Sequence, residues 1–405
     1  MFITIQRNTR VGGTVNNLPS SKSISNRALL LNVLSGNQSV VSNLSTARDT
    51  RLMTAVINRP DKVIDVMDAG TTMRFLTAFF ALTGKNKILT GTDRMKQRPI
   101  ALLVNALRTL GATIAYLDKE GFPPIETKGF AGQKANSVSL PGDVSSQYIS
   151  ALMMMAPLLP QGLTIRIEGP IGSLPYIEMT AALMKTFGVT CDFDGRSIHI
   201  PPTPYQSSHL TIEADWSAAS YWFAFTALAE QAELRLPNVS RQSLQGDRVI
   251  VEVMERLGVK AVFQQSMAIL SKQAHAAFIE WDFKNCPDLA QTVIPVCAAK
   301  GIPGSFAGME SLRIKETDRI AALQTELAKI GAELKEEKTG HWKLIPAAMA
   351  EFVAIETYHD HRMAMGFAPW ATLAKLRIEE PDVVNKSYPG FWVDMRAIGF
   401  EIGDR

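Results

Sequence analysis

The sequence predicts an α/β protein of two similar domains, each built from three copies of one βαβαββ unit. Two patterns predict this architecture. Segments that begin with small or polar residues run into almost wholly apolar stretches, and amphipathic stretches with a shared Gly-containing end lie between them. The chain has 405 residues, of which 46% are hydrophobic and 20% charged, and these values suit two globular domains of ordinary size.

The apolar stretches carry the repeat. They are PSSKSISNRALLLNVL from Pro19, AGTTMRFLTAFFAL from Ala69, DVSSQYISALMMMAPLL from Asp143, DWSAASYWFAFTALA from Asp215, CPDLAQTVIPVCAA from Cys286 and HDHRMAMGFAPWATLA from His359. A helix that is apolar on every side is buried, so we expect one such helix inside each unit. The polar residues at their heads are typical N-caps. Because helix N-termini carry unpaired N–H groups and partial positive charge, heads that meet would also form a site for anions.

The amphipathic stretches end in a common way. They are ALRTLGATIAY, LMKTFGVTCDF, VMERLGVKAVF and ELAKIGAELKE, with a less regular copy, FWVDMRAIGFEI, near the end of the chain. Gly after the last helical turn predicts a left-handed cap that feeds a strand. The first interval between apolar heads is shorter than the others, and RDTRLMTAVIN is followed only by DKVIDVMDAG. We therefore predict that the first unit lacks about two strands.

The domain boundary is predicted in the polar stretch PNVSRQSLQGD, Pro237–Asp247, which precedes the next amphipathic helix. Residues 21–236 would then form one domain. The N-terminal strand, residues 1–20, would join residues 237–405 in the other.

Composition excludes several classes of protein. The formal charge of +3 is too small for a typical nucleic-acid binder. Cys191, Cys286 and Cys297 have no paired or metal-type spacing, which favours buried thiols in a reducing cytoplasm. MFITIQRNTRV reads as a strand rather than a signal peptide, and no apolar stretch is long enough to cross a bilayer. We expect a soluble, cytoplasmic protein without a membrane partner. No nucleotide loop, GxSxG or HExxH motif is present.

Charged residues cluster at the apolar heads. Lys22 opens the first, and Ser23 and Arg27 share one helical face. Arg74 follows Gly70, whose missing side chain would let backbone approach a phosphate. Further charges lie in RMKQRP, CPD, SLRIKETDR and HDHR. Taken singly, each head is more simply a cap and each charge run a solvated surface. A charged residue directly before a buried helix favours a functional role instead.

Successive segments resemble the signatures of one enzyme family. PSSKSISNRALLL, AGTTMR, RMKQRPI, GDVSSQY, SLPYIE, CPD, SLRIKETDR, YHDHRMAM and NKSYPGF are similar, in order, to those of the 5-enolpyruvylshikimate-3-phosphate (EPSP) synthases. The resemblance implies an inside-out α/β barrel in each domain and an active site in the interdomain cleft. It also implies transfer of the enolpyruvyl group of phosphoenolpyruvate to the 5-hydroxyl of shikimate 3-phosphate, in the shikimate pathway. These two small molecules would be its partners; we expect a monomer with no metal or organic cofactor.

The resemblance also implies the site residues. Catalytic candidates are Asp288, Glu316, Lys22 and His361. Candidates for binding shikimate 3-phosphate are Lys22, Ser23, Arg27, Ser145, Ser146, Gln147, Ser173, Asp288, Ser311 and Lys315, with Tyr176 nearby. Candidates for binding phosphoenolpyruvate are Lys22, Gly70, Arg98, Gln147, Arg319, Arg362 and Lys386. We expect Asp288 to accept the hydroxyl proton and Glu316 to deliver and remove the C3 proton. His361 would tune this proton transfer or be purely structural.

The sequence departs from the family pattern at Asp68, Phe75 and Ser311, where Asn, Pro and Asn are usual. One alternative is the related UDP-N-acetylglucosamine enolpyruvyl transferase. Its catalytic Cys or Asp would fall within 75–98, which has no Cys and only Asp93. A second alternative is a catalytically inactive relative that binds a phosphorylated metabolite.

Overall fold

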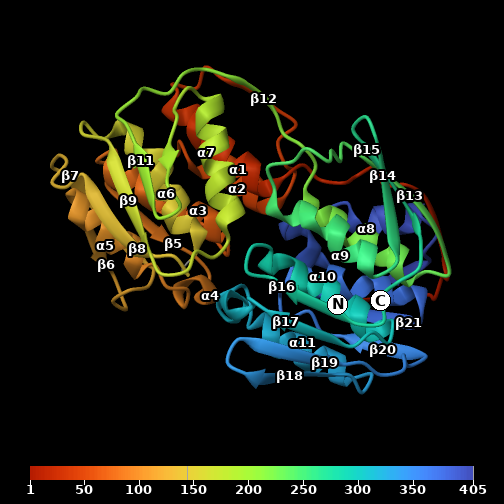
Figure 1. Ribbon diagram of the computed structural model, residues 1–405. Helices are drawn as coiled ribbons and strands as arrows, with labels where there is room; N and C mark the ends of the chain where they lie inside the picture. Colours follow the sequence, from red (N-terminus) through yellow and green to blue (C-terminus); the bar gives the residue numbers. More distant parts are fainter. Residues whose placement is uncertain (144, 405) are drawn as a thin grey trace. The chain divides into compact units, whose positions relative to one another are not determined.

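The computed structural model describes residues 1–143 and 145–404 (Figure 1). These residues divide into two compact units. The terminal unit comprises Met1–Ser21, Thr46–Arg48 and Glu213–Arg405, and the central unit comprises Lys22–Ser45 and Asp49–Ile212. Within the described parts of the chain, no helix has the length and apolar character needed to cross a membrane.

The central unit contains three small sheets, with strand orders β4-β5-β7-β6, β10-β11-β9-β8 and β12-β3. Its strands are β3 (Val40–Ser42), β4 (Val63–Asp65), β5 (Lys87–Thr90), β6 (Ala112–Tyr116), β7 (Ile125–Phe130), β8 (Ser137–Pro141), β9 (Leu163–Glu168), β10 (Asp192–Phe193), β11 (Ser197–Ile200) and β12 (His209–Thr211). Its helices are α1 (Lys22–Leu34), α2 (Arg48–Val56), α3 (Gly70–Leu82), α4 (Asp93–Lys96), α5 (Ala101–Leu110), α6 (Ser146–Met155) and α7 (Leu174–Thr186).

The terminal unit also contains three sheets, with strand orders β14-β15-β13-β2, β16-β17-β19-β18 and β20-β21-β1-β22. Its strands are β1 (Phe2–Ile5), β2 (Arg10–Thr14), β13 (Gln231–Pro237), β14 (Val259–Gln264), β15 (Met267–Lys272), β16 (Ile279–Asp282), β17 (Gly304–Ala307), β18 (Glu333–Lys338), β19 (His341–Ile345), β20 (Phe352–Ile355), β21 (Lys375–Glu379) and β22 (Ile402–Asp404). Its helices are α8 (Trp216–Leu228), α9 (Ile250–Arg256), α10 (Ala290–Ala299), α11 (Arg319–Ala328), α12 (His361–Phe367) and α13 (Phe391–Ala397).

The predicted repeat is confirmed in the order and pairing of these elements. In one copy, β4 and β5 are parallel and joined through α3, and the chain then passes through α4 and α5 into the antiparallel pair β6 and β7. The shortened first unit is confirmed too. Its β3 pairs only with β12, so this sheet has two strands where the other sheets of the described chain have four.

The strands beside two of the points where the chain passes between the units pair within their own unit. β2, which precedes the passage from Ser21 to Lys22, pairs in parallel with β13, and β12, which precedes the passage from Ile212 to Glu213, pairs in parallel with β3. An antiparallel bridge between Ser20 and Ala214 joins the two crossing segments on the terminal unit. The backbone N–H of Ser21 donates to the carbonyl of Glu213 at 2.8 Å and that of Asp215 to Pro19 at 2.8 Å. Each crossing strand therefore completes the sheet of the unit it leaves.

The last crossing lies between Ile212 and Glu213, earlier than the predicted hinge at 237–247. That polar stretch lies inside the terminal unit because its side chains bind the crossing segment. Gln245 Nε2 donates to Glu213 Oε1 and to the Ala214 carbonyl, at 2.8 Å each, and Gln245 Oε1 accepts from Trp216 N at 3.0 Å. The polar stretch 237–247 is therefore not the linker between the units; its Gln245 binds the segment that follows the crossing.

The predicted buried helices are confirmed as the cores of the two units. Side chains of α1, α3 and α6 lie in the central core, and those of α8, α10 and α12 lie in the terminal core. Figure 1 shows α8 beside β13, β14 and β15, and it packs against all three strands. The Gly stops adopt positive φ as predicted, at Gly111 (112°), Gly188 (85°), Gly258 (96°) and Gly331 (78°).

A substitution at Gly111 tests this cap. A Cβ there would collide with the carbonyl oxygen of Gly132, whereas one on Gly132 itself, at a similar φ of 108°, would meet no atom within 4 Å. We expect Gly111→Ala to lower the free energy of unfolding by at least about 1 kcal/mol more than Gly132→Ala, because only the first adds overpacking to backbone strain. Urea titration of both variants measures the difference. Equal losses would contradict this account of the cap.

Candidate active site

Charged residues of the terminal unit gather at or just before the starts of its helices α10, α11 and α12. Asp288 lies in a short 3₁₀ turn, Pro287–Leu289, directly before α10. Glu316 precedes α11, and Arg319 is the first residue of that helix. Arg362 is the second residue of α12, and Lys386 ends a 3₁₀ turn, Pro381–Lys386. The polar heads that the sequence predicts are therefore brought together here from separate segments.

Arg319 is the centre of this cluster and is only 1% exposed. Its Nε donates to Asp360 Oδ2 at 2.6 Å, its Nη1 to Asp288 Oδ1 at 3.0 Å, and its Nη2 to Glu316 Oε2 at 2.9 Å. Burial alone would lower the pKa of Arg319, but these three carboxylates outweigh burial and raise it. The guanidinium is permanently charged and fixes three carboxylates around one plane.

Asp288 is held on both of its oxygens. Oδ2 accepts from Arg362 Nη2 at 2.9 Å, Oδ1 accepts from Arg319, and Lys315 Nζ lies 3.8 Å from Oδ1. Burial favours the neutral acid, but the charges of Arg362, Lys315 and Arg319 together lower the pKa of Asp288 well below its usual range. Asp288 is thus an ionised carboxylate and, in this arrangement, a weak base.

The cluster combines several cations with several carboxylates. Lys386 is 1% exposed, and its Nζ lies 3.7 Å from Glu316 Oε1. The cations are Lys315, Arg319, Arg362 and Lys386, and the carboxylates are Asp288, Glu316 and Asp360. A buried cluster with several cations suits an anionic ligand. His361 borders it, with Nδ1 3.4 Å from Asp360 Oδ1, and Ser311 lies half-buried in the 3₁₀ turn Glu310–Ile314 before Lys315.

In the central unit, Lys22 is the first residue of α1. Its Nζ lies 3.2 Å from Oδ2 of Asp49, which is 4% exposed and sits in the first turn of α2. The sequence analysis assigned no role to Asp49, because it stands in an amphipathic stretch where a solvated charge is the usual outcome. Its burial beside a predicted site lysine makes Asp49 part of the site.

Arg27 is buried and bonded within the central unit. Its Nε donates to Thr180 Oγ1 at 2.8 Å, its Nη2 to Ser150 Oγ at 3.0 Å, and its Nη1 to the Ser23 carbonyl at 3.0 Å. Burial lowers the pKa of Arg27 to about 10, so it stays charged at neutral pH. A guanidinium has five N–H donors, so Arg27 has donors beyond these three for a ligand.

Phe75, which departs from the family pattern, and Tyr176 both lie against Arg27. Its guanidinium carbon lies 5.3 Å from the ring centroid of Phe75 and 5.8 Å from that of Tyr176, within cation–π range. Helix α3 continues through Phe75 without a break, from Gly70 to Leu82. Phe75 therefore supplies a face for the arginine, and its place in α3 does not disturb the helix.

The head of α3 joins three predicted binding residues. No side chain caps this helix, and the guanidinium of Arg98 lies against Gly70, where a Cβ would come within 2.7 Å of Nη2. Gln147 Nε2 donates to Thr71 Oγ1 at 3.2 Å, which connects the heads of α6 and α3. Arg74 Nη2 donates to the Pro99 carbonyl at 3.0 Å and so braces the segment that carries Arg98.

The remaining serines lie at helix starts. Ser145 caps α6 by accepting from Gln147 N at 3.4 Å, and Ser146 is the first residue of that helix. Ser173 precedes α7 with a left-handed φ of 56° and makes no capping hydrogen bond. Residue 144 of this segment lies outside the described residues.

Sequence analysis also missed residues of the terminal unit. Asp360 stands inside the HDHR motif, caps α12 by accepting from Arg362 N at 2.9 Å, and binds Arg319. Asp360 stands between two histidines, which drew attention away from it. The known preference for Asp at N-cap positions is the signal that could have identified it. Tyr221 accepts from Arg362 Nη1 at 3.4 Å, and its spacing in an all-apolar helix gave no polar signal.

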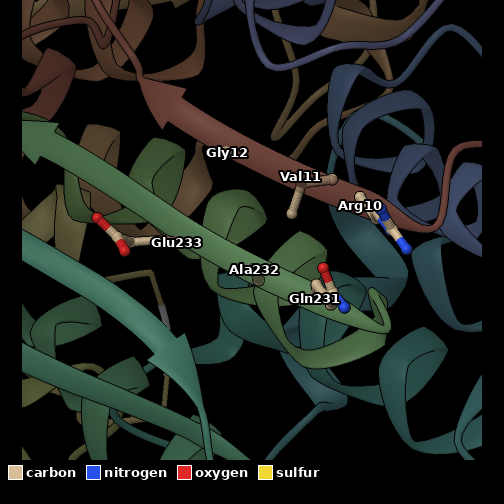
Figure 2. Close-up of a pocket in the computed structure, with 6 residues that line it drawn as sticks. All are labelled: Arg10, Val11, Gly12, Gln231, Ala232 and Glu233. Carbon is tan, nitrogen blue, oxygen red and sulfur yellow. The ribbon is translucent and has the colours of Figure 1, made fainter.

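A shallow pocket lies on the terminal unit over the paired strands β2 and β13 (Figure 2). It is lined by Arg10, Val11, Gly12, Gln231, Ala232 and Glu233. None of these belongs to the charged cluster. Among the described residues, no three His, Cys, Asp or Glu side chains are grouped so that they could hold a metal ion.

Comparisons with known proteins identify the family of the chain. The family model of EPSP synthase (3-phosphoshikimate 1-carboxyvinyltransferase) matches residues 5–59 and 55–395. The chain belongs to this family. Its activity is that of EPSP synthase, in the shikimate pathway. The two matched stretches overlap at residues 55–59, at the end of α2, where the shortened first unit lacks its strand pair.

Named relatives support the assignment. A 3-phosphoshikimate 1-carboxyvinyltransferase of Bacteroides fragilis strain YCH46 is 47% identical over 390 residues, 95% of each chain. One from Cronobacter sakazakii is 36% identical over 429 residues, 98% of each. The solved structure of an EPSP synthase from Acinetobacter baumannii has a TM-score of 0.77 at 18% identity and covers 100% of both chains, which shows the shared fold.

Gly70→Ala tests the contact with Arg98. The added methyl would displace the guanidinium, the far end of a flexible side chain, so we expect little loss of stability but a KM for phosphoenolpyruvate raised about tenfold, the size of one charge-assisted hydrogen bond. Gly12→Ala is the control, since its Cβ would lie at an ordinary 3.7 Å from the nearest atom. Steady-state kinetics decides. An unchanged KM in Gly70→Ala would show that Arg98 need not occupy this position.

Proposed function

We propose that this chain transfers the enolpyruvyl group of phosphoenolpyruvate to the 5-hydroxyl of shikimate 3-phosphate, releases inorganic phosphate, and uses the charged cluster around Arg319 for both proton transfers. The observation that carries the proposal is that Asp288 and Glu316 share one buried guanidinium. Two carboxylates beside several cations suit a reaction between two anions that needs one base and one acid.

Phosphoenolpyruvate would bind through its carboxylate to Arg319 and Arg362. A guanidinium matches a carboxylate in a bidentate way, and both side chains are already held in place by protein acceptors. A ligand carboxylate on these arginines would neutralise part of the charge that now lowers the pKa of Asp288. Binding of the first anion would thereby turn Asp288 into a stronger base.

Each proton then has a carrier. Asp288 accepts the proton of the 5-hydroxyl as its oxygen attacks C2. Glu316, which must first take up a proton from solvent as the substrates bind, gives that proton to C3, and a tetrahedral adduct forms. Glu316 then takes a C3 proton back while the C2–O bond to phosphate breaks and the bonding electrons leave with the phosphate. Lys22 and Lys386 stabilise the negative charge on the departing phosphate. His361 positions Asp360 or tunes this transfer.

Shikimate 3-phosphate would bind mainly to the central unit. Candidates are Lys22, Ser23, Arg27, Ser145, Ser146, Gln147 and Ser173, with Ser311 and Lys315 from the terminal unit. The heads of α1 and α6 and the start of α7 supply N–H groups and partial positive charge for its phosphate. Gly70 and Arg98 would hold the phosphate of phosphoenolpyruvate.

Because the candidate residues are divided between the two units, we infer that the active site forms in a cleft between two domains that close on the substrates. Closure would exclude water from the adduct and complete both half-sites. We also expect the protein to act as a monomer.

Phosphate release tests the proposal directly. The purified chain is incubated with phosphoenolpyruvate and shikimate 3-phosphate, and in parallel with phosphoenolpyruvate and UDP-N-acetylglucosamine. We expect phosphate only from the first mixture. Release only from the second would assign the chain to the related transferase. Binding of both substrates without release would identify an inactive relative.

Asp288→Asn and Glu316→Gln test the assigned roles. Each keeps the shape of the side chain but removes its ability to carry a proton, so we expect kcat to fall about 10²- to 10⁴-fold. Asp282→Asn is the control, because Asp282 is an exposed carboxylate of the same unit. Thermal unfolding followed by circular dichroism checks that the variants are folded. A near-native kcat in either variant would remove that residue from the mechanism.

A further inference from the structure

Asp247 is a buried carboxylate outside the set that contacts Arg319. It lies in a 3₁₀ turn, Gly246–Val249, and is 3% exposed. Its Oδ2 accepts a hydrogen bond from Ser217 Oγ, whereas its Oδ1 has no hydrogen-bond partner among the described residues. Buried carboxylates are normally bonded on both oxygens, so this arrangement calls for an explanation.

Ser217 connects Asp247 to the charged cluster. It is not needed as a cap, because Asp215 already caps α8 by accepting from Ala218 N at 3.0 Å. Arg362 Nη2 donates to Ser217 Oγ at 3.3 Å and to Asp288 Oδ2 at 2.9 Å. The direction of this end of the guanidinium is therefore set by Asp288 on one side and by Ser217 on the other.

We propose that Asp247 is a positioning residue, which orients the Ser217 hydroxyl so that Ser217 holds Arg362 for the carboxylate of phosphoenolpyruvate. A serine hydroxyl has one hydrogen and two lone pairs. When Asp247 is ionised it accepts that hydrogen, and a lone pair must face Arg362. The proposal rests on the role of Arg362 given under the proposed function, and it extends the site to residues that contact no substrate.

The charge state of Asp247 controls this orientation. Burial raises the pKa of Asp247 to about 7; Asp288 and Asp215 add to the rise, while Arg362 and the Ser217 hydrogen bond oppose it. The titratable and charged groups that face it from neighbouring elements are Asp215, Asp288, Cys286 and Arg362. Burial raises the pKa of the Cys286 thiol to about 12, so it does not titrate in the same range. Once protonated, Asp247 can donate a hydrogen bond to Ser217 Oγ. The serine hydroxyl can then rotate, and its lone pair need not face Arg362.

Kinetics of four variants tests the proposal. Asp247→Asn and Ser217→Ala break the orientation, Ser217→Thr keeps the hydroxyl, and Asp282→Asn is an exposed control. We measure kcat and KM for phosphoenolpyruvate from about pH 6 to about pH 8.5, with shikimate 3-phosphate saturating. In the wild type, KM falls as the pH rises through about 7, where Asp247 ionises.

At about pH 8, Asp247→Asn and Ser217→Ala should each raise KM about 3- to 10-fold, the worth of one hydrogen bond, with kcat changed less than about twofold. Both should lose the pH step, and the double variant should be no worse than either single one. Ser217→Thr and Asp282→Asn should behave as the wild type. Native KM and a retained pH step in both Asp247→Asn and Ser217→Ala would overturn the proposal, as would additive effects.

Thermal unfolding over the same pH range gives a second readout. Because the pKa of Asp247 is raised in the folded state, the stability it contributes is complete at acidic pH and is lost as the pH rises through about 7. The wild type should therefore lose Tm relative to Asp247→Asn across this range, and a constant difference would show that Asp247 is not held as inferred. If the wild type releases no phosphate, the proposed function fails. Calorimetric binding of phosphoenolpyruvate to the same variants then decides the positioning role.

Discussion

The charged cluster depends on the guanidinium of Arg319, which is buried and contacts three carboxylates. A buried arginine is stable only if its charge and its donors are matched, and loss of one partner from such a pair typically costs about 3–5 kcal/mol. The partners Asp288 and Asp360 come from the starts of α10 and α12, and Glu316 precedes α11, which Arg319 itself begins. One ion-pair network therefore fixes the relative positions of three helix starts, and with them the distance between the two candidate proton carriers.

In the central unit, the buried charge of Arg27 is surrounded by neutral groups instead of carboxylates. Arg27 is buried against the hydroxyls of Thr180 and Ser150 and the faces of two aromatic rings, with no carboxylate bonded to it. Its charge is therefore less compensated than that of Arg319, and its pKa is lowered where that of Arg319 is raised. This difference suits different roles for the two units in the proposed mechanism. Uncompensated cations and hydroxyls favour binding of phosphate and hydroxyl groups, whereas a network with its own carboxylates can also transfer protons.

Local sequence patterns predicted the fold because their causes are local. The apolar stretches, the Gly stops and the short first interval each reflect helix burial, cap geometry or chain length within one unit, and all three were confirmed. The pairing of β2 with β13 and the position of the last crossing were not predictable, because both depend on segments that lie far apart in the sequence. Gln245 and Asp247 look like residues of a polar linker, and only their buried partners distinguish them from one. The same reasoning explains why Asp49 was missed while Lys22 was found: Lys22 stands at an apolar head, and Asp49 does not.

The cluster also explains how a site can hold a base among so many cations without losing catalytic power. While two arginines bind Asp288, its pKa is low, and it cannot accept a proton effectively. In the proposed mechanism an anionic substrate would compete for the same arginines and reduce their field, which would couple the titration of Asp288 to occupancy of the site. The cations of the cluster would therefore have two effects in the proposed mechanism. They would attract the anionic substrates, whose arrival would relieve the field on Asp288, so that proton transfer would follow binding.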